Sequence, residues 1–359
     1  MERTLPWSWY ADPEVLRREQ ELIFRRAWQY AGHAGEVAEP GSYATARAGD
    51  VPILVTRDRD GELRAFLNVC RHRGAQLVDG PARRETIQCP YHAWTYALDG
   101  TLRAAPRADR EPGFAREELG LVPVRLETWG PLLFVNPDPE APPLAETLGE
   151  LPRLVADAGI DLDALVFHHR STSHYEANWK ICCENFLECY HCAVAHPGFS
   201  AVIDVSFDAY ELEETSEWFS TQRGPVRENG RGSFDVREGE VERSQFHFLW
   251  PNVTINVAPG QANLSIGPVL PDGPERTTRF LDYFFAPDAD PEWVREFLAW
   301  DDQVGAEDTA LVERVQRGVR SGAVAEGVLL PESERLVAHF QRNVAEALRA
   351  SGDRAGWHR

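Results

Sequence analysis

Two short loops decide the fold of this chain: residues 70–74 read Cys70-Arg71-His72-Arg73-Gly74, and residues 89–94 read Cys89-Pro90-Tyr91-His92-Ala93-Trp94. A strand-like run precedes each loop, Phe66–Val69 before the first and Thr86–Gln88 before the second. The pattern C-x-H followed at a distance by C-x-x-H can therefore bring two thiolates and two imidazoles together at two loop tips. Gly74 and Pro90 are residue types typical of the tight turns that such tips need.

These four candidate ligands are compatible with two kinds of metal centre. A Cys₂His₂ zinc site uses the same residue types. Common zinc spacings, however, place the two cysteines together and the two histidines together, whereas here each loop supplies one of each. That arrangement suits a two-iron cluster held by sulfur at one iron and by nitrogen at the other. Zinc remains the alternative at this point.

The two loops resemble those of a Rieske [2Fe-2S] domain. The resemblance implies that Cys70 and Cys89 hold one iron of the cluster, while His72 and His92 hold the other. It implies that the two imidazoles face solvent or a neighbouring subunit and carry the electron outward. Trp94 is expected to pack over the cluster, with an ordinary core position as the alternative.

A second group of candidate ligands lies between residues 178 and 196. The run Asn178–His191 has helical periodicity, which would place Glu184, Glu188 and His191 on one face at i, i+4 and i+7. His196 follows just beyond the expected end of this helix. Two histidines and one carboxylate on one side of an iron(II) leave positions open for O₂ and substrate. The spacing therefore indicates a site that needs one further ligand.

The third ligand has to come from elsewhere in the chain. A helix expected from about Pro291 to Arg320 offers four carboxylates, and an exposed amphipathic surface is the plain alternative for such a charge run. Spacing alone leaves the four nearly equal: Asp301, Asp302, Glu307 and Asp308.

The resemblance to Rieske oxygenases extends to this second group. Asn178-Trp179-Lys180, Glu184-Asn185-Phe186 and Glu188-Cys189-Tyr190-His191 through His196-Pro197 are similar to the family's catalytic helix, and Glu307-Asp308 ahead of Gln316-Arg317-Gly318 is similar to its third-ligand segment. The resemblance implies the iron ligands His191, His196 and Asp308. It implies that Glu188 bridges His191 to His92 of an adjacent subunit, and that Asn185 supports the iron site from nearby.

The resemblance also implies an α+β fold in three parts. A helical N-terminal segment (1–37), with a helix from about Asp12 to Trp28, would pack on the catalytic domain. A small all-β Rieske domain (38–140) would end at the proline-rich stretch Asn136–Pro143. The catalytic domain (141–359) would hold an antiparallel sheet flanked by helices, of the helix-grip or START-like kind. Its expected strands include Gln245–Val257 and Arg279–Phe285, and its last helix Glu332–Ala350.

For function, the resemblance implies the oxygenase (α) component of a mono- or dioxygenase. Such an enzyme uses O₂ as co-substrate, a Rieske [2Fe-2S] cluster, a mononuclear Fe(II), and electrons from a reductase or ferredoxin that draws on NAD(P)H. Family members form rings, so a homotrimer or homohexamer is expected. A Rieske electron carrier without the second iron and a zinc-stabilised interaction protein are the non-enzymatic alternatives.

The segment Glu188–Pro197 is similar to the branch that acts on quaternary ammonium compounds such as betaines, carnitine and choline. Aromatic-ring hydroxylation and aromatic O-demethylation are the alternatives. Two expected strands carry rings that could cage a cation, although core packing is the more common role for any one such ring. These rings are Phe246, Phe248 and Trp250 on one strand, and Tyr210, Trp218 and Phe219 on the other.

Composition excludes some partners. The 37 basic and 57 acidic residues give a formal charge of -20, which would repel nucleic acid. No apolar run is long enough to span a bilayer, and the N-terminus lacks a signal-peptide layout, so we expect a cytoplasmic protein without a membrane partner. Arginines near the first motif could attract an acidic electron donor, or could simply be solvated: Arg71, Arg73, Arg83 and Arg84. The crowded cysteines are expected to serve helix packing: Cys182, Cys183, Cys189 and Cys192.

Overall fold

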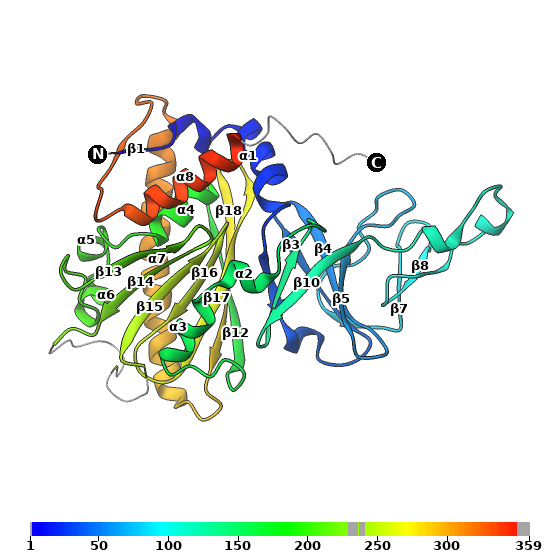
Figure 1. Ribbon diagram of the computed structural model, residues 1–359, viewed down its shortest axis with the longest axis horizontal. Helices are drawn as coiled ribbons and strands as arrows, with labels where there is room; N and C mark the ends of the chain where they lie inside the picture. The colour runs from blue at the N-terminus through cyan, green and yellow to red at the C-terminus, as the bar shows by residue number, and fades with distance from the viewer. Residues whose placement is uncertain (1, 229–235, 237–240, 350–359) are drawn as a thin grey trace. The chain divides into compact units, whose positions relative to one another are not determined.

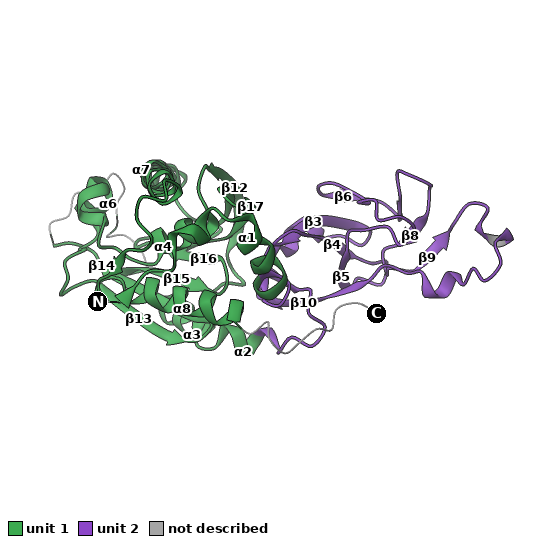
Figure 2. Ribbon diagram, turned by 90° about the horizontal axis from the view of Figure 1, so that it is seen from above, with its two compact units in different colours: residues 1–23, 145–359 green, residues 24–144 purple. Residues whose placement is uncertain are grey.

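The computed structural model of the chain describes residues 2–228, 236 and 241–349, and the chain divides into two compact units (Figures 1 and 2). Unit 1 comprises Met1–Ile23 and Ala145–Arg359, and unit 2 comprises Phe24–Leu144. The strand β2 (Gln29–His33) lies ahead of the boundary that we expected at residue 38 and pairs with β11 (Leu132–Asn136) in unit 2. Among the helices of the described ranges, none combines the length and the apolar character that crossing a membrane requires.

The first helix is shorter than expected. Asp12 caps α1 (Pro13–Glu19) by accepting a hydrogen bond from a backbone N–H of the first turn, which satisfies one of the donors left free at a helix start. The helix continues as the π-helical turn η2 (Gln20–Phe24) and ends there. Trp28, which we expected at the end of this helix, lies instead in unit 2, where its Nε1 donates to the carbonyl of Pro142 at 2.9 Å.

Unit 2 is the expected all-β unit. Its seven-stranded antiparallel sheet has the order β2-β11-β10-β5-β4-β3-β6, and a separate three-stranded sheet has the order β7-β8-β9. The remaining elements are β3 (Ser42–Ala48), β4 (Val51–Arg57), β5 (Leu63–Leu67), β6 (Ala82–Arg83), β7 (Thr86–Gln88), β8 (Thr95–Ala97), β9 (Leu102–Ala104) and β10 (Pro123–Trp129), with the 3-10 turns η3 (Ala34–Val37), η4 (Ala108–Arg110) and η5 (Arg116–Glu118).

The alternation of side chains along β4 separates two cores in unit 2. Ile53 and Val55 belong to one buried cluster, while Leu54 between them belongs to a second cluster that also contains Cys70 and Cys89. Successive side chains of a strand point to opposite faces of its sheet. The second core therefore lies on the face of the sheet that positions both cysteine–histidine loops.

Unit 1 contains the antiparallel sheet expected of the catalytic domain. Its strand order is β12-β18-β17-β16-β15-β14-β13. Strands β13 to β18 form a meander, and β12 pairs with β18 at one edge of the sheet. The strands are β12 (Val166–Tyr175), β13 (Glu211–Ser216), β14 (Phe219–Pro225), β15 (Arg243–Leu249), β16 (Val253–Val257), β17 (Asn263–Gly273) and β18 (Arg276–Phe285), and β1 (Glu2–Arg3) pairs with β19 (Val328–Leu329) apart from this sheet. The helices are η1 (Trp7–Tyr10), α2 (Leu144–Leu148), α3 (Leu151–Asp157), α4 (Trp179–Phe186), α5 (Cys192–Ala195), α6 (Pro197–Val202), α7 (Pro291–Arg320) and α8 (Arg335–Arg349).

Several sequence-based boundaries differ from these elements. The segment Gln245–Val257 forms two paired strands, β15 and β16, joined by a turn that contains a cis peptide bond before Pro251. The helix α7 has the expected bounds. The helix α8 begins at Arg335, later than the expected Glu332, and Ala350 lies outside the described residues.

The long helix α7 packs against the sheet through aromatic side chains. Trp293, Phe297 and Trp300 of α7 lie in one buried cluster with Leu281 and Tyr283 of β18. Burial of each such ring removes a large apolar area from water and stabilises the fold by roughly 2 kcal/mol or more. The helix α7 is thereby fixed against the sheet, which determines where its polar side chains point.

Candidate metal centres

The helix α4 is anchored to the N-terminal segment by a fully buried ion pair. Lys180 donates from Nζ to Oε1 of Glu19 at 2.6 Å, and both side chains have 0% exposure. The other carboxylate oxygen of Glu19 accepts from Nε1 of Trp179 at 2.8 Å. A charge buried this deeply is tolerated only with a partner, so the pair fixes the register of α4 against α1.

The helix α4 ends at Phe186, so the expected continuous helix up to His191 is wrong. Glu184 and Glu188 consequently do not share a helix face. Glu184 accepts hydrogen bonds from the Tyr10 hydroxyl at 2.6 Å and from Nε2 of Gln341 at 3.0 Å, away from the histidines. Burial raises the pKa of Glu184 to about 7.

Glu188 organises the turn that follows α4. Its Oε2 accepts from the backbone N–H of Tyr190 at 2.5 Å and of His191 at 3.1 Å. Its Oε1 lies 2.5 Å from Nδ1 of His191. The carboxylate therefore holds both the backbone and the ring of His191, and it turns the Nε2 edge of that ring toward His196.

His196 is oriented by the residue next to the expected third ligand. It directly precedes α6, and its Nδ1 lies 2.8 Å from Oε2 of Glu307. On the other side of the ring, its Nε2 lies 3.0 Å from Oδ1 of Asp308. Two neighbouring carboxylates of α7 thus contact the two nitrogens of one imidazole. Sequence reasoning weighed Glu307 only as an alternative ligand and missed this contact.

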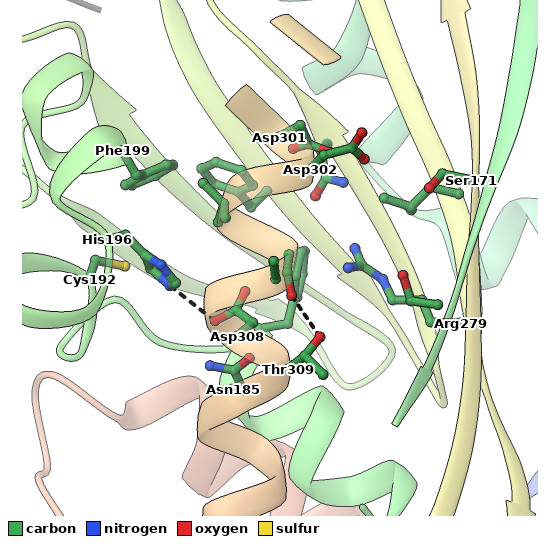
Figure 3. Close-up of a pocket in the computed structure, with 18 of the residues that line it drawn as sticks. Ser171, Asn185, Cys192, His196, Phe199, Arg279, Asp301, Asp302, Asp308 and Thr309 are labelled. Carbon is green, nitrogen blue, oxygen red and sulfur yellow. Dashed lines mark hydrogen bonds and ion pairs between the residues drawn. The ribbon is translucent and has the colours of Figure 1, made fainter. Parts of the chain in front are cut away.

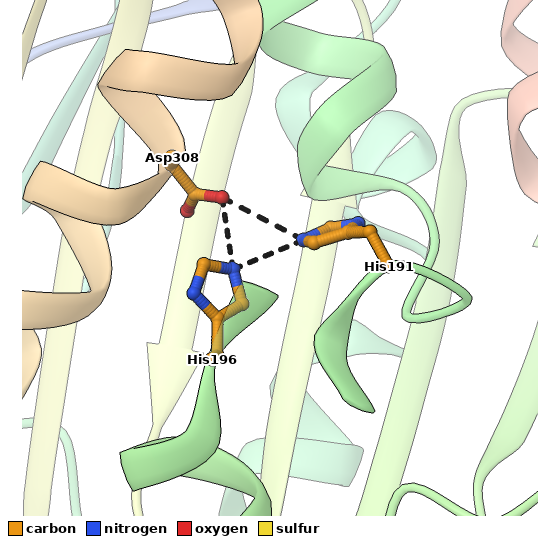
Figure 4. A group of neighbouring side chains, drawn as sticks. All are labelled: His191, His196 and Asp308. Atoms are coloured by element: carbon orange, nitrogen blue, oxygen red, sulfur yellow. Dashed lines mark hydrogen bonds and ion pairs between the residues drawn. The ribbon is translucent and has the colours of Figure 1, made fainter. Parts of the chain in front are cut away.

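Three candidate ligand atoms converge between α7 and the segment that carries the short helices α5 and α6 (Figure 4). Nε2 of His191 lies 3.1 Å from Nε2 of His196 and 3.6 Å from Oδ1 of Asp308. Ligands about 2.1 Å from one ion and near right angles to each other lie about 3 Å apart. The triangle therefore fits a divalent cation, and two imidazoles with one carboxylate on one face are the donor set of non-haem iron(II) sites.

The electrostatics of the triangle favour a cation. Burial acts to lower the pKa of His191, but the carboxylates of Asp308 and Glu188 outweigh it and raise this pKa to about 9. Burial acts to raise the pKa of Asp308, but His191 and His196 outweigh it and hold this pKa well below its ordinary value. A metal at this position takes the place of the imidazolium proton, since only the unprotonated nitrogen can bind it.

The other residues that the sequence offered for this site lie outside the ligand triangle. Nδ2 of Asn185 lies 3.4 Å from Nε2 of His191, at the edge of the triangle. Asp301 accepts from the Tyr283 hydroxyl at 2.5 Å, and Asp302 is exposed. Of the four carboxylates that spacing left equal, Asp308 is the one whose oxygen completes the triangle.

The triangle opens onto a cavity of about 430 Å³ between α7 and the sheet (Figure 3). Such a volume suits a small organic molecule. Four carboxylates line it, and Arg279 is the one lysine or arginine among its lining residues in the described part of the chain. The carboxylates are those of Glu188, Asp301, Asp302 and Asp308.

The prediction that all four crowded cysteines serve helix packing is only half right. Cys182 and Cys183 are buried thiols of α4. Cys189 and Cys192, in contrast, form a disulfide across the turn that carries His191, and both line the cavity. The turn is not helical at Cys189, which lets two residues three positions apart approach each other.

The predicted aromatic residues divide between the cavity and the core. Phe246 and Tyr210 line the cavity. Phe248 and Trp250 instead contact Phe340 of α8, with ring centroids 5.6 and 5.8 Å apart. Trp218 is exposed and Phe219 is buried, and neither lines the cavity. Sequence reasoning missed Phe199, whose ring lies 6.5 Å from that of His196 and 5.8 Å from that of Phe246.

In unit 2, the two cysteine–histidine loops have matching backbone geometry. The N–H of Cys70 donates to the carbonyl of Ala75, and the N–H of Cys89 donates to that of Trp94, at 2.8 and 2.7 Å. Each loop has one residue in the left-handed region, Gly74 (φ 74°) in the first and Ala93 (φ 58°) in the second. A left-handed alanine is uncommon, so the closing hydrogen bonds must hold this turn.

The side chains of the loops gather at one place. The rings of His72 and His92 have centroids 4.5 Å apart, and Trp94 stacks on His72 at 4.9 Å. Nδ1 of His92 is buried and has no hydrogen-bond partner. Because buried ring nitrogens are normally paired, this orphaned atom fits a metal ligand.

Tyr96, which sequence reasoning missed, contacts the first loop. Its hydroxyl lies 3.4 Å from Sγ of Cys70 and accepts from the N–H of Arg71 at 3.1 Å. A hydroxyl beside a ligand sulfur would help to set the potential of a cluster. Tyr96 lies two residues after Trp94, and both belong to the same buried cluster; this spacing was the available signal.

The four residues of the loops do not form a compact site for a single ion. Among the described residues, three ligand atoms within 4.8 Å of one another occur at His191, His196 and Asp308 and not at the loops. A zinc site would need that closeness, whereas a cluster of two irons and two sulfides spreads its ligands.

Comparison with known proteins agrees with both centres. Residues 27–125 match the family described as Rieske [2Fe-2S] domain, and residues 162–350 match the ring hydroxylating alpha subunit (catalytic domain). The chain therefore belongs to the Rieske-type ring-hydroxylating oxygenases, as an α (oxygenase) subunit. It is an oxidoreductase whose cofactors are a Rieske [2Fe-2S] cluster and a mononuclear iron.

Particular relatives are similar over nearly the whole chain. The carnitine monooxygenase oxygenase subunit of Escherichia coli (strain K12) is 34% identical over 96% of this chain and 94% of its own length. The chloroplastic choline monooxygenase of Spinacia oleracea is 34% identical over 94% of this chain and 76% of its own. A solved quaternary ammonium Rieske monooxygenase, described with carnitine oxidation and inter-subunit electron transfer, superposes with a TM-score of 0.84 at 31% identity, covering 96% of this chain and 95% of that one.

Proposed function

We propose that the chain is the oxygenase component of a monooxygenase that hydroxylates or N-demethylates a quaternary ammonium compound. The observation that carries this proposal is the cavity at the His191–His196–Asp308 triangle, which combines an excess of carboxylates with aromatic rings. Carboxylates and ring faces both attract a cation that has no hydrogen to donate. The similarity to carnitine and choline monooxygenases supports the same substrate class.

In this proposal, His191, His196 and Asp308 hold the mononuclear iron, and Cys70, Cys89, His72 and His92 hold the cluster. The iron supplies the activation of O₂, and the cluster supplies single electrons. Glu188 and Glu307 keep the Nδ1 side of each iron-binding imidazole occupied, so that each Nε2 faces the metal. Asn185, whose Nδ2 lies near Nε2 of His191, would help to position what binds beside the iron.

The proposal includes an oligomer and an electron donor. The inter-subunit electron transfer described for the similar monooxygenase supports an assembly of several subunits, for which we propose a homotrimer or homohexamer. In such an assembly, Glu188 would link His191 to His92 of the neighbouring subunit, because its carboxylate is already bonded to Nδ1 of His191. A reductase or ferredoxin would supply the electrons, and the arginines near the cluster loops are candidate contacts for it. The cytoplasmic location stays a prediction.

Metal analysis tests the centres. Purified protein should contain about three irons and two acid-labile sulfides per chain. Two irons that stay at two after anaerobic Fe(II) loading would indicate an electron carrier. Zinc without sulfide would remove the cluster assignment altogether.

A substrate panel tests the reaction. The chemically reduced, iron-loaded protein should convert at least one of glycine betaine, carnitine, stachydrine and choline in a single turnover, with the product followed by mass spectrometry. Conversion of aromatic acids or aromatic ethers, with no conversion of any quaternary amine, would overturn the proposed substrate class.

A further inference from the structure

Arg279 is a guanidinium with unused hydrogen-bonding capacity beside the candidate iron site. It lies on β18, and its side chain points into the cavity (Figure 3). Its Nε is buried and has no hydrogen-bond partner, while its Nη2 donates to Oγ1 of Thr254 at 3.3 Å. An arginine normally uses its Nε edge to bind a carboxylate through two parallel hydrogen bonds. On that edge of Arg279, Nε has no partner among the described residues, and Nη2 has only the uncharged hydroxyl of Thr254.

The contrast with a neighbouring arginine of the same sheet is direct. Arg170, on β12, is also partly buried, and it makes two hydrogen bonds to Asp282 at 2.6 and 2.8 Å. Arg279 has no carboxylate of the described residues within ion-pair distance. Asp301 contributes only a longer-range attraction, because its carboxylate already accepts from the Tyr283 hydroxyl. The Tyr175 hydroxyl also bonds the guanidinium. A largely buried guanidinium without a counter-charge is nevertheless costly, and an anionic ligand group would remove that cost.

The far side of the cavity has the opposite character. Figure 3 shows His196 and Phe199 across the cavity from Arg279, with Asp308 between them. Phe199 and Phe246 present rings there, and the lining carboxylates outnumber the single arginine. One cavity thus has an anion-binding group at one side and cation-attracting groups at the other. A molecule with both charges satisfies both sides.

We propose that Arg279 binds the carboxylate of the substrate, so that this chain selects zwitterionic quaternary ammonium acids (betaines) over choline-type cations. The inference rests on the proposed function and narrows it. A betaine pairs its carboxylate with the unused Nε edge and places its methylammonium group on the His196 side. Choline has no anionic group, so it would leave Arg279 unpaired and would bring a second positive charge into the cavity.

The first test compares ligands on the unaltered holoenzyme. Dissociation constants of glycine betaine, its methyl ester and choline are measured by anaerobic titration calorimetry on the iron-loaded protein. The ester keeps the cation and removes the anionic charge. Loss of one charge-assisted, bidentate contact should weaken binding of the ester and of choline by about 10- to 100-fold relative to glycine betaine. Equal affinity for the acid and the ester would overturn the inference.

The second test alters the protein. Arg279→Gln should weaken the binding of glycine betaine by the same 10- to 100-fold, and it should not weaken the binding of choline or of the ester, because it also removes the positive charge that disfavours them. Arg279→Lys, which keeps the charge, should fall between. Arg276→Gln is the matched control, because Arg276 is exposed on the same strand, and it should change nothing. Equal loss of all three ligands in Arg279→Gln would overturn the inference, and if that variant does not fold, the ester comparison decides alone.

The two proposals fail in different ways. If the unaltered protein neither binds nor converts any quaternary amine, with or without a carboxylate, the proposed function fails and the inference falls with it. If the protein converts both choline and betaines and binds them with equal affinity, the proposed function stands and the inference alone is overturned.

Discussion

Glu307 and His196 form a hydrogen bond of 2.8 Å on the side of the imidazole opposite to the one that faces Asp308. Consecutive helical residues point about 100° apart, which lets one acid of the pair reach Nδ1 and the other lie near Nε2. The pair of acids therefore has divided functions: Asp308 lies in the ligand triangle, and Glu307 sets the orientation of the ring. A carboxylate behind a metal-bound histidine also increases its basicity.

The two acids should consequently respond differently to substitution. Asp308→Ala should lower the iron content from about three to about two per chain and leave the sulfide content unchanged. Glu307→Gln should retain three irons on loading but hold the mononuclear iron about 10- to 100-fold more weakly. Iron and sulfide analysis after dialysis against a chelator measures both. Asp302→Ala, at an exposed position of the same helix, is the control and should keep three irons. If Glu307→Gln loses the mononuclear iron and Asp308→Ala keeps it, Glu307 and not Asp308 is the third ligand.

Glu188 should matter for electron delivery more than for iron binding. Glu188→Gln keeps a hydrogen-bonding group near Nδ1 of His191 but removes the charge, so the iron should stay bound. The reduced cluster should then be reoxidised in the presence of substrate and O₂ about 10- to 100-fold more slowly. Stopped-flow absorbance of the cluster measures this rate. An unchanged rate in the iron-replete variant would show that Glu188 only shapes the turn.

How far the sequence predicted this site depends on the distance between its parts. The two cysteine–histidine loops were predictable as candidate ligand loops because each Cys–His pair lies within a few residues of a strand end. His191 and His196 were predictable as candidate ligands because they are five residues apart around the end of one helical run. Asp308 was not, because it is 112 residues from His196, and only the family resemblance selected it from four carboxylates.

Other features depended on tertiary contacts that periodicity does not report. Apolar spacing continued past Phe186, and no glycine or proline marked the helix end, yet the chain turns at Leu187 so that Glu188 can bond the backbone of His191. The cysteines three residues apart were read as helix packing for the same reason. Arg279 lies on a strand that was predicted correctly, but nothing in its sequence neighbourhood showed that its Nε would lack a partner.

Glu184 should make stability depend on pH. Burial raises the pKa of this carboxyl to about 7 in the folded chain, against about 4.3 when unfolded. Between these values the folded state binds the proton and the unfolded state does not, so stability falls as pH rises from about 4.5 to 7, by at most about 4 kcal/mol. Glu184→Gln keeps an oxygen for Tyr10 and Gln341. Its melting temperature relative to the unaltered chain should therefore rise across this range, and a constant difference would contradict the pKa.

The Lys180–Glu19 pair should be the most sensitive ion pair of unit 1. Lys180→Met leaves the carboxylate of Glu19 fully buried without its counter-charge, which should cost about 3–5 kcal/mol of unfolding free energy. Glu19→Gln added to Lys180→Met removes that charge while keeping an acceptor for Trp179, so it should recover much of the loss. Arg17→Gln is the matched control, because Arg17 of the same helix α1 makes its ion pairs with Glu14 and Glu21 at the exposed surface, and it should show no measurable change. Denaturant unfolding followed by tryptophan fluorescence measures all three variants. If Lys180→Met is as mild as Arg17→Gln, the buried pair does not hold α4 in place, and the position of the turn that carries Glu188 and His191 must be fixed by other contacts.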